Sequence, residues 1–191
     1  GASLAGQRIT PTSAEQISTV YTCVRVLSET LASLPLVIYR RKGDDETERA
    51  TKHPLYPLLH GAPSELVTSF RFFQAAMAHL NLRGNSYARL RTMAGRVSGI
   101  DIFPPDTVQP TERDGQWFYV YRPKNRGGPE VLLPDEVLHL RGLTDDGIVG
   151  KSPIDAQRET LGMSLAALSY GARFFANDTR PSVVFKHPGK L

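Results

Sequence analysis

The sequence has one cysteine and no long apolar run, and both absences narrow the kind of protein it can be. A lone Cys23 cannot form a disulfide within the chain, which suits a reducing compartment. No stretch of about 18 consecutive apolar residues is present, so no transmembrane helix is expected. The first residues, GASLAGQRITPTS, lack the charged start and the apolar stretch of a secretory signal peptide. A disulfide-stabilised or membrane-spanning protein is therefore not expected.

Neither sign of charge dominates the chain. Lys and Arg total 23, Asp and Glu total 19, and the net charge is +4 with a pI of about 9.3. The excess lies in the first half, because residues 1–95 hold 11 basic and 7 acidic residues and residues 96–191 hold 12 of each. This mild excess permits a nucleic-acid partner but does not require one, and plain solubility is the favoured explanation. A length of 191 residues with 40% hydrophobic residues predicts one large globular domain or two small ones.

Three segments have the apolar periodicity of amphipathic helices. The first follows a capping pair at Thr12-Ser13 and has an apolar stripe of Ile17, Val20, Val24, Leu27, Leu31 and Leu34. The second is capped at Thr68-Ser69, ends at Gly84, and has on one face Phe70, Phe73, Met77 and Leu80. The third opens at Ser152-Pro153 and has an inner stripe of Ile154, Leu161, Leu165, Leu168, Ala172 and Phe175. Cys23 lies in the first helix, where a buried, unreactive thiol is expected.

Short β-rich runs separated by turn residues lie between the helices. They are residues 35–41, 86–92 and 97–104, a pair on either side of Asp114-Gly115, and a pair on either side of Pro134-Asp135. Asp-Gly between two such runs is a strong hairpin signal. A last short strand is expected at 183–185. The sequence therefore predicts an α+β fold, with three amphipathic helices packed on a mostly antiparallel set of short strands.

Motifs that would indicate catalysis or cofactor binding are missing. The sequence contains no G-x-S-x-G elbow, no P-loop and no G-x-G-x-x-G. None of the five histidines has the metal-ligand spacing to a Cys, Asp or Glu. His53 and His60 are close in sequence, but two prolines between them argue against a helical ligand pair. His139 alternates within a strand pattern, which favours a structural residue with a satisfied hydrogen bond. No catalytic, cofactor-binding or metal-binding residue is predicted, no cofactor is expected, and the chain is not expected to be an enzyme.

Other clusters could support a function but have a simpler structural interpretation. Asp145-Asp146-Gly147 could bind a cation, yet an Asp-rich turn before a helix is stabilised by local side-chain to backbone bonds. The Arg-Phe-Phe runs at 71–73 and 173–175 could stack on bases, but their helical spacing favours core packing. The basic run YRRK at 39–42 could contact phosphates, although the acidic residues at 44–48 would weaken that attraction.

Four long segments occur in an order that resembles the portal proteins of tailed bacteriophages, of the kind found in long-tailed phages and prophages. The segments are VYTCVRVLSETLASLPLVIYRR (20–41), HPLYPLLHGAPSELVTSFRFFQAAMAHLNLRGNSYARL (53–90), LPDEVLHLRGLTDDGIVGKSPI (133–154) and YGARFFANDTRPSVVFKHPGKL (170–191). The resemblance covers nearly the whole chain from about Ser13. Two regions depart from the usual pattern: the family often has Asn-Gly where this chain has Asn177-Asp178, and residues 91–130 match less distinctively.

The resemblance implies a structural role. Portal subunits form a ring, commonly twelve-fold, at one capsid vertex, and DNA passes through the ring during packaging and ejection. The implied partners are copies of the same subunit, the terminase motor, capsid and connector proteins, and double-stranded DNA, with no membrane partner. The implied location is the virion, with the host cytoplasm during assembly. None of these roles requires a catalytic residue.

The resemblance also implies a division of the chain. Residues 1–12 are expected to form a flexible N-terminal segment, and residues 13–191 the wing-like body, as the N-terminal part of a longer subunit that continues past Leu191. Two alternatives remain open. A stand-alone DNA-binding module would bind duplex DNA with a steep salt dependence. A phage-encoded hydrolase or nuclease would lose its activity on substitution of Asp145 and Asp146.

Overall fold

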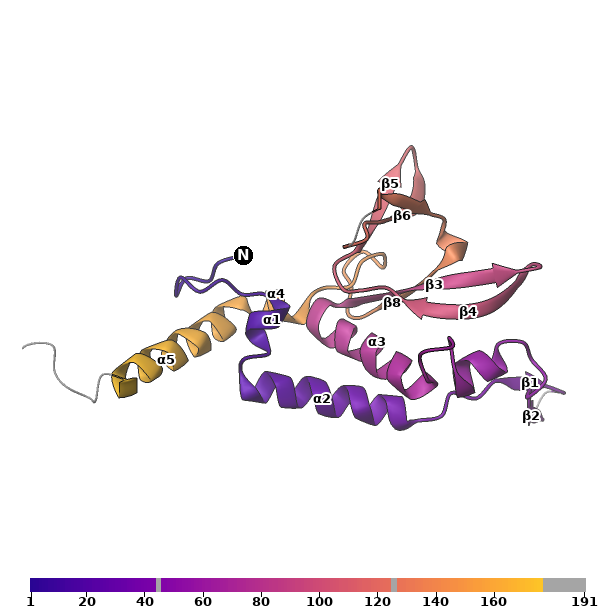
Figure 1. Ribbon diagram of the computed structural model, residues 1–191, viewed down its shortest axis with the longest axis horizontal. Helices are drawn as coiled ribbons and strands as arrows, with labels where there is room; N and C mark the ends of the chain where they lie inside the picture. Colours follow the sequence, from indigo (N-terminus) through magenta and orange to yellow (C-terminus); the bar gives the residue numbers. More distant parts are fainter. Residues whose placement is uncertain (44–45, 125–126, 177–191) are drawn as a thin grey trace, which may run out of the picture.

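A computed structural model describes residues 1–43, 46–124 and 127–176 as helices with three small antiparallel sheets (Figure 1). The helical elements are α1 (Pro11–Ala14), α2 (Ser18–Ser33), the π-helical turn η1 (Pro57–Gly61), α3 (Ser69–Arg83), the 3-10 turn η2 (Pro134–Glu136), α4 (Pro153–Ala156) and α5 (Arg158–Ala176). The strands are β1 (Tyr39–Arg41), β2 (Thr47–Arg49), β3 (Asn85–Met93), β4 (Arg96–Ile102), β5 (Val108–Arg113), β6 (Gln116–Tyr121), β7 (Glu130–Leu132) and β8 (Val137–Arg141). The predicted α+β class is confirmed; the expected strand at 183–185 lies outside the described residues.

The strands form three separate antiparallel sheets in the orders β1-β2, β4-β3-β8 and β5-β6-β7. In the second sheet β3 is central, and Ala88 pairs with Ile102 on one side and Leu138 on the other. The turn between β5 and β6 has positive φ at both Asp114 (53°) and Gly115 (76°), as a two-residue Asp-Gly hairpin requires. The predicted hairpin at Asp114-Gly115 is therefore confirmed.

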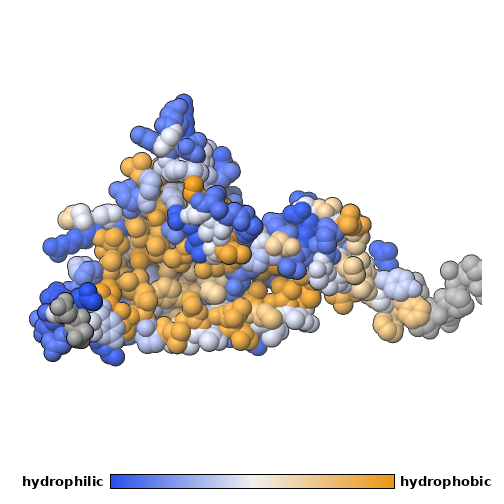
Figure 2. Space-filling view, turned by 180° about the vertical axis from the view of Figure 1, so that it is seen from behind, coloured by the Kyte–Doolittle hydropathy of each residue, from blue (hydrophilic) through white to orange (hydrophobic). Residues whose placement is uncertain are grey.

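The elements are arranged as layers with two extensions. Figure 1 shows α3 between α2 and the β4-β3-β8 sheet, with the β5-β6-β7 sheet above them. The β1-β2 hairpin lies at one end of the molecule, and α5 projects from the other end. Seen from behind, the tip of the upper sheet is hydrophilic, whereas apolar side chains gather in a broad area over the lower part of the molecule (Figure 2).

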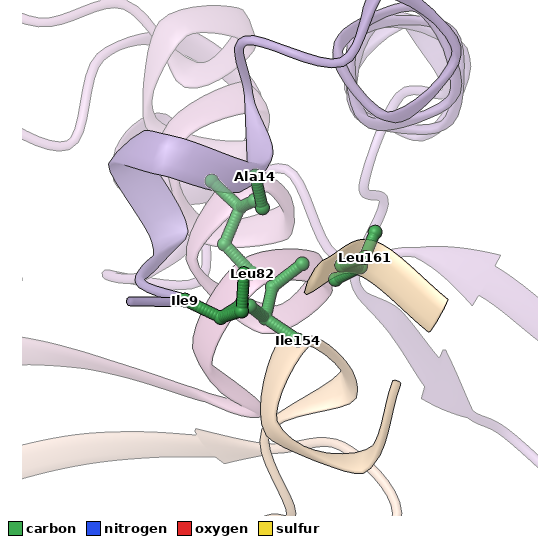
Figure 3. Close-up of a cluster of buried hydrophobic side chains, with 5 residues drawn as sticks. All are labelled: Ile9, Ala14, Leu82, Ile154 and Leu161. Carbon is green, nitrogen blue, oxygen red and sulfur yellow. The ribbon is translucent and has the colours of Figure 1, made fainter. Parts of the chain in front are cut away.

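Buried apolar side chains form three clusters. The clusters are Phe72, Ala88 and Ile100 between α3 and the central sheet, Phe103, Tyr119, Leu132 and Val137 between the two larger sheets, and Ile9, Ala14, Leu82, Ile154 and Leu161 near the chain's N-terminus. Figure 3 shows that the last cluster joins α1, the end of α3, α4 and the start of α5. Ile9 is only 2% exposed, and the predicted boundary after residue 12 falls inside α1. Flexibility of residues 1–12 stays a prediction.

The first predicted helix is wrong in its start and in its buried face. Thr10 and Ser13 form the capping box at the start of the short α1, of which Thr10 is the N-cap and Ser13 the third residue, and α2 begins separately at Ser18. Within α2 the fully buried positions are Ser28 and Ala32, small residues that let α3 approach closely. Cys23 lies off this face and is exposed, so the expectation of a buried thiol is wrong.

The second helix follows the prediction at both ends. Thr68 caps α3 by accepting a hydrogen bond from the Arg71 amide (3.4 Å), and Gly84 ends it with φ of 76°. A Cβ on Gly84 would lie 2.0 Å from the Lys151 carbonyl oxygen, so this position excludes a side chain for a second reason. The buried face is different from the predicted one, because Phe72 and Ala76 rather than Phe70 pack inside.

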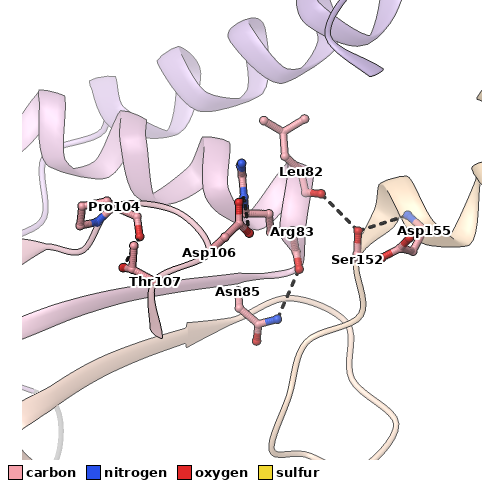
Figure 4. A network of polar contacts seen from close by, with 8 residues as sticks. All are labelled: Leu82, Arg83, Asn85, Pro104, Asp106, Thr107, Ser152 and Asp155. Carbon is pink, nitrogen blue, oxygen red and sulfur yellow. Dashed lines mark hydrogen bonds and ion pairs between the residues drawn. The ribbon is translucent and has the colours of Figure 1, made fainter. Parts of the chain in front are cut away.

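The third predicted helix is two helices. Ser152 caps α4 as expected: its Oγ accepts from the Asp155 amide (3.2 Å) and donates to the Leu82 carbonyl (3.2 Å), which ties α4 to the end of α3 (Figure 4). Gln157 then leaves the helical conformation, with φ −104° and ψ 19°, and α5 begins at Arg158. The break turns α5 away from the body (Figure 1).

Candidate functional surfaces

The structure gives His53 and His60 local roles. The Nδ1 atom of His53 accepts a hydrogen bond from the Leu55 amide (3.2 Å), and the His60 ring lies 5.1 Å from the Tyr56 ring. Among the residues that the structure describes, no group of three or more His, Cys, Asp or Glu side chains could hold a metal ion. These two histidines therefore belong to the proline-rich turn around η1.

The Asp-rich loop before α4 is a turn held by its own backbone. Asp146 Oδ1 accepts hydrogen bonds from the amides of Val149 (2.9 Å) and Ile148 (2.8 Å). These bonds, with a further one from the Thr144 hydroxyl, stabilise the carboxylate and lower the pKa of Asp146. Asp145 forms an ion pair with Lys151 at 2.7 Å. The interpretation of this motif as a turn is confirmed.

His139 is a structural residue in a polar network, as predicted. Its Nε2 lies 2.9 Å from Asn85 Oδ1, and its Nδ1 lies 3.2 Å from both the Tyr119 hydroxyl and Arg141 Nε. Burial, with a smaller contribution from Arg141, lowers the pKa of His139 to about 4. The imidazole is therefore neutral at pH 7, and the amide oxygen on one side requires the proton on Nε2.

Asn85 connects this network to the loop that precedes α4. Its Oδ1 accepts from the Gly150 amide (2.7 Å), and its Nδ2 donates to the Gly150 carbonyl (2.7 Å) and the Arg83 carbonyl (3.3 Å; Figure 4). No sequence pattern indicates this role, because Asn85 simply follows the glycine that ends a helix. One side chain thereby fixes a loop 65 positions further along the chain.

A small polar cavity of about 150 Å³ lies at the end of α3. Arg83 and Asp106, which both line the cavity, form an ion pair at 3.0 Å (Figure 4). His79 and Tyr87 line the cavity as well. Burial, assisted by the nearby Arg83, lowers the pKa of His79 to about 4. Because Arg83 is paired with Asp106 and the imidazole of His79 is neutral at pH 7, these groups give the cavity no net charge that would select an ionic ligand.

The basic run at 39–42 lies in and after the exposed β1 strand. Lys42 forms an ion pair with Glu48 of β2 at 2.7 Å, so one positive charge of the basic run is neutralised within the hairpin. Arg40 and Arg49 line a polar hollow together with Glu48. This agrees with the prediction that acidic neighbours weaken phosphate attraction at this site.

The largest departure from the sequence interpretation is α5, whose apolar side chains are exposed. Phe174 is 48% exposed and Phe175 is 75% exposed, so core packing of the second Arg-Phe-Phe run is wrong for the described residues; in the first run Phe72 is buried as predicted. The predicted stripe runs along one face of α5, and its last three residues, Leu168, Ala172 and Phe175, line a wide groove of about 660 Å³ with Ile17. A further set lies on the opposite face at i, i+7 and i+11, namely Met163, Tyr170 and Phe174.

A second exposed apolar surface lies at the C-terminal end of α2. Leu27, Leu31 and Leu34 are 52%, 44% and 65% exposed, although Val20 and Val24 of the same stripe pack against the N-terminal cluster. Scattered exposed leucines are normal, but rows at helical spacing indicate packing surfaces. These leucines were predicted as part of one apolar stripe, but their exposure was not predicted. Periodicity identifies an apolar face without showing what lies on it. No helix in the described part of the chain has the length and apolar character needed to cross a bilayer.

Comparisons of this chain with protein families and with individual proteins point to the same family. The chain matches the phage portal protein family over residues 18–191. It is 36% identical to the probable portal protein of Streptomyces phage phiC31 over 97% of this chain and 42% of that protein. It is 30% identical to the portal protein of Enterobacteria phage HK97 over 86% of this chain and 39% of that protein.

The fold is shared with a solved assembly. A chain in the neck of an empty gene transfer agent (GTA) particle, computed with C6 symmetry, superposes with a TM-score of 0.72 and 23% identity, covering 95% of this chain and 50% of that one. The present chain spans about two fifths of the length of the curated relatives it matches. With a family match that covers most of its length and two relatives at 30% identity or more, the chain belongs to the phage portal protein family.

Proposed function

We propose that this chain is part of a structural subunit of a portal ring at a capsid vertex. The observation that carries the proposal is the portal-family match over residues 18–191, in a fold shared with a particle neck. In this role the ring is the conduit for double-stranded DNA during packaging and ejection. It is also the platform on which terminase and head–tail connector proteins dock, while the motor rather than this subunit supplies the energy.

The apolar faces of α5 support assembly into a ring. A helix with apolar side chains on two opposite faces is stable in water only when both faces are covered. In a cyclic assembly each subunit contacts two neighbours through two different surfaces. A projecting helix such as α5 suits that geometry. A subunit of such a ring would reside in the virion, and it would assemble in the host cytoplasm.

The proposal is tested on the full-length subunit by negative-stain electron microscopy and by mass measurement in solution. Rings with a central opening, and a mass that is an integer multiple of the subunit mass, are expected. A well-folded full-length protein that stays monomeric at high concentration would contradict the proposal. Duplex-DNA binding with a steep salt dependence in that monomer would then favour a DNA-binding module.

A matched pair of variants connects ring formation to α5. Met163→Asp with Phe174→Asp places two charges on the exposed apolar face, and we expect fewer rings because those charges would be buried on assembly. Leu143→Asp is the control, because Leu143 is 80% exposed in a loop away from α5. Substitution of Asp145 and Asp146 by alanine should alter only the loop; loss of a measurable hydrolase activity would instead favour an enzyme.

A further inference from the structure

An apolar groove between the C-terminal end of α2 and α3 has no cover among the residues that the structure describes. The groove encloses about 230 Å³ and is lined by Leu31, Leu34, Pro35, Leu36 and Phe73. Leu31, Leu34 and Leu36 are 44%, 65% and 44% exposed. We call this surface the α2–α3 groove.

The groove continues a packing stripe that is already covered at its other end. Val20 and Val24 pack against the N-terminal cluster, which includes residues of α1, α4 and α5. Leu27, Leu31 and Leu34 continue the same helical line over seven residues, about 10 Å or two helical turns. The spacing of apolar residues along α2 is the same in its covered and its uncovered half. The uncovered half therefore has the kind of surface against which a second element packs.

The groove is too small to hold a separate molecule by itself. Three or four half-exposed leucines and one phenylalanine edge offer a few hundred Å² of apolar surface, below the roughly 800 Å² per partner of a stable protein interface. A segment of the same chain needs much less contact area, because its tether supplies a high effective concentration. The size of the groove therefore favours an occupant within the same subunit over a second copy.

The length of the relatives provides such a segment. The matched region is 42% and 39% of the two curated portal relatives, so more than half of each relative lies outside it. We propose that a two-turn amphipathic helix from the part of the full-length subunit outside residues 1–191 packs into the α2–α3 groove of its own subunit. The proposal rests on the proposed function only in assuming a subunit as long as those relatives.

The groove also defines the chemistry of the occupant. Two turns of helix laid beside Leu27, Leu31 and Leu34 would need apolar side chains at i, i+3 or i+4, and i+7. The residues that line the groove are all apolar, and the charged Glu29 and Arg71 line a separate groove between the same two helices. An occupant with apolar side chains on one face and polar side chains on its outer edges would therefore fit without burying a charge.

The test uses cysteine labelling of the full-length subunit. A Leu31→Cys variant is compared with a Met93→Cys control, because Met93 is 72% exposed at the end of β3. The rate at which a maleimide reacts with each new thiol is followed by peptide mass spectrometry, which also separates both from Cys23. We expect labelling at position 31 to be at least about tenfold slower than at position 93, because it would require local opening. Leu34→Cys serves in the same way if Leu31→Cys does not fold.

A cross-linking measurement identifies the occupant. A photoreactive amino acid replaces Leu34, and isotope-labelled and unlabelled subunits are mixed in equal amounts before assembly. Cross-links that join position 34 to the part of the subunit outside residues 1–191, always within one isotope form, are expected. Cross-links between different isotope forms would overturn the proposal in favour of a neighbouring copy, and equal labelling rates at positions 31 and 93 would overturn it in favour of an open groove.

The same samples keep the two proposals distinguishable. Rings seen by electron microscopy with a fully reactive position 31 would contradict the groove proposal alone. A protected position 31 in a subunit that never forms rings would contradict the ring proposal alone.

Discussion

The 2.9 Å contact between His139 Nε2 and Asn85 Oδ1 joins strand β8 to strand β3 at the point where the loop before α4 is attached. Asn85 uses both ends of its amide on Gly150, so the sheet and the loop share one hydrogen-bonding centre. Within a partly buried network, removing one member leaves several groups without partners. This network is the clearest point at which a single polar side chain determines the fold.

Asn85→Ala is expected to lower the free energy of unfolding by about 2 kcal/mol, because it leaves the Gly150 amide, the Gly150 carbonyl and the Nε2 atom of His139 without their hydrogen-bond partner. Chemical denaturation measures the loss. Gln109→Ala is the control, since the exposed Gln109 side chain accepts one hydrogen bond from Arg122, and a change below about 0.5 kcal/mol is expected there. Equal losses in both variants would contradict a central role for Asn85.

Acid should destabilise the protein through two histidines. Burial lowers the pKa of His79 and His139 to about 4 in the folded state, from 6.5 in the unfolded chain. The unfolded chain therefore binds protons first as the pH falls. The stabilisation is fully present above pH 6.5, decreases as the pH falls toward about 4, and is lost below that value. Thermal unfolding between pH 7 and pH 4 measures it.

Variants separate these histidines from the carboxylates that also titrate in acid. His79→Gln with His139→Gln should flatten the upper part of the acid limb, between pH 6.5 and pH 5, even though both substitutions lower stability at neutral pH. His60→Gln is the matched control, because His60 is exposed, and it should keep the slope of the parent protein. An unchanged slope in the double variant would show that other groups dominate.

Two glycines of α5 should respond in opposite directions to alanine. A Cβ on Gly162 would lie 2.1 Å from Ser3 Oγ and 2.3 Å from Ser3 Cβ, so Gly162→Ala should displace the N-terminal segment and destabilise the protein. A Cβ on Gly171 would meet nothing within 4 Å, and Gly171→Ala should stabilise the helix by up to about 1 kcal/mol. The melting temperatures of the two variants test this, and a shared sign would refute it.

The two Arg-Phe-Phe runs should differ sharply. Phe72 is 1% exposed, and Phe72→Ala should cost about 3–5 kcal/mol of stability. Phe175 is 75% exposed, and Phe175→Ala should change the stability of residues 1–191 by less than about 0.5 kcal/mol. Denaturant titration of both variants makes the comparison. A large loss from Phe175→Ala would mean that α5 is covered within these residues.

Sequence reasoning predicted the elements better than their packing. The Asp114-Gly115 hairpin, the Thr68 cap and the Gly84 helix end were predictable because each depends on local backbone chemistry. The break at Gln157 was not, since no proline or glycine marks it. Neither was the exposure of Cys23, because a difference of one position on a helix turns a side chain by about 100°.

For the candidate surfaces too, the features that depend on local sequence were predictable and those that depend on distant residues were not. The turn at Asp146 and the satisfied His139 were predictable from residue type and local pattern. The hydrogen-bonding role of Asn85 depends on Gly150, which lies 65 positions away, and no local pattern encodes that distance. The uncovered leucines of α2 and one apolar face of α5 were visible as stripes, whereas the second face of α5, with Met163, Tyr170 and Phe174, was not predicted; only the arrangement of the elements shows which of these residues are exposed.

Because the helix is broken at Gln157, α5 projects from the body of the molecule as a separate element. Its 19 residues form an arm about 28 Å long, and its base is fastened by the N-terminal segment, where the Leu4 amide donates to Glu159 at 2.8 Å and Ser3 packs on Gly162. A rotation of about 10° at the base would carry the far end of α5 through about 5 Å. Small adjustments among the first residues of this chain are therefore magnified at the tip of the helix.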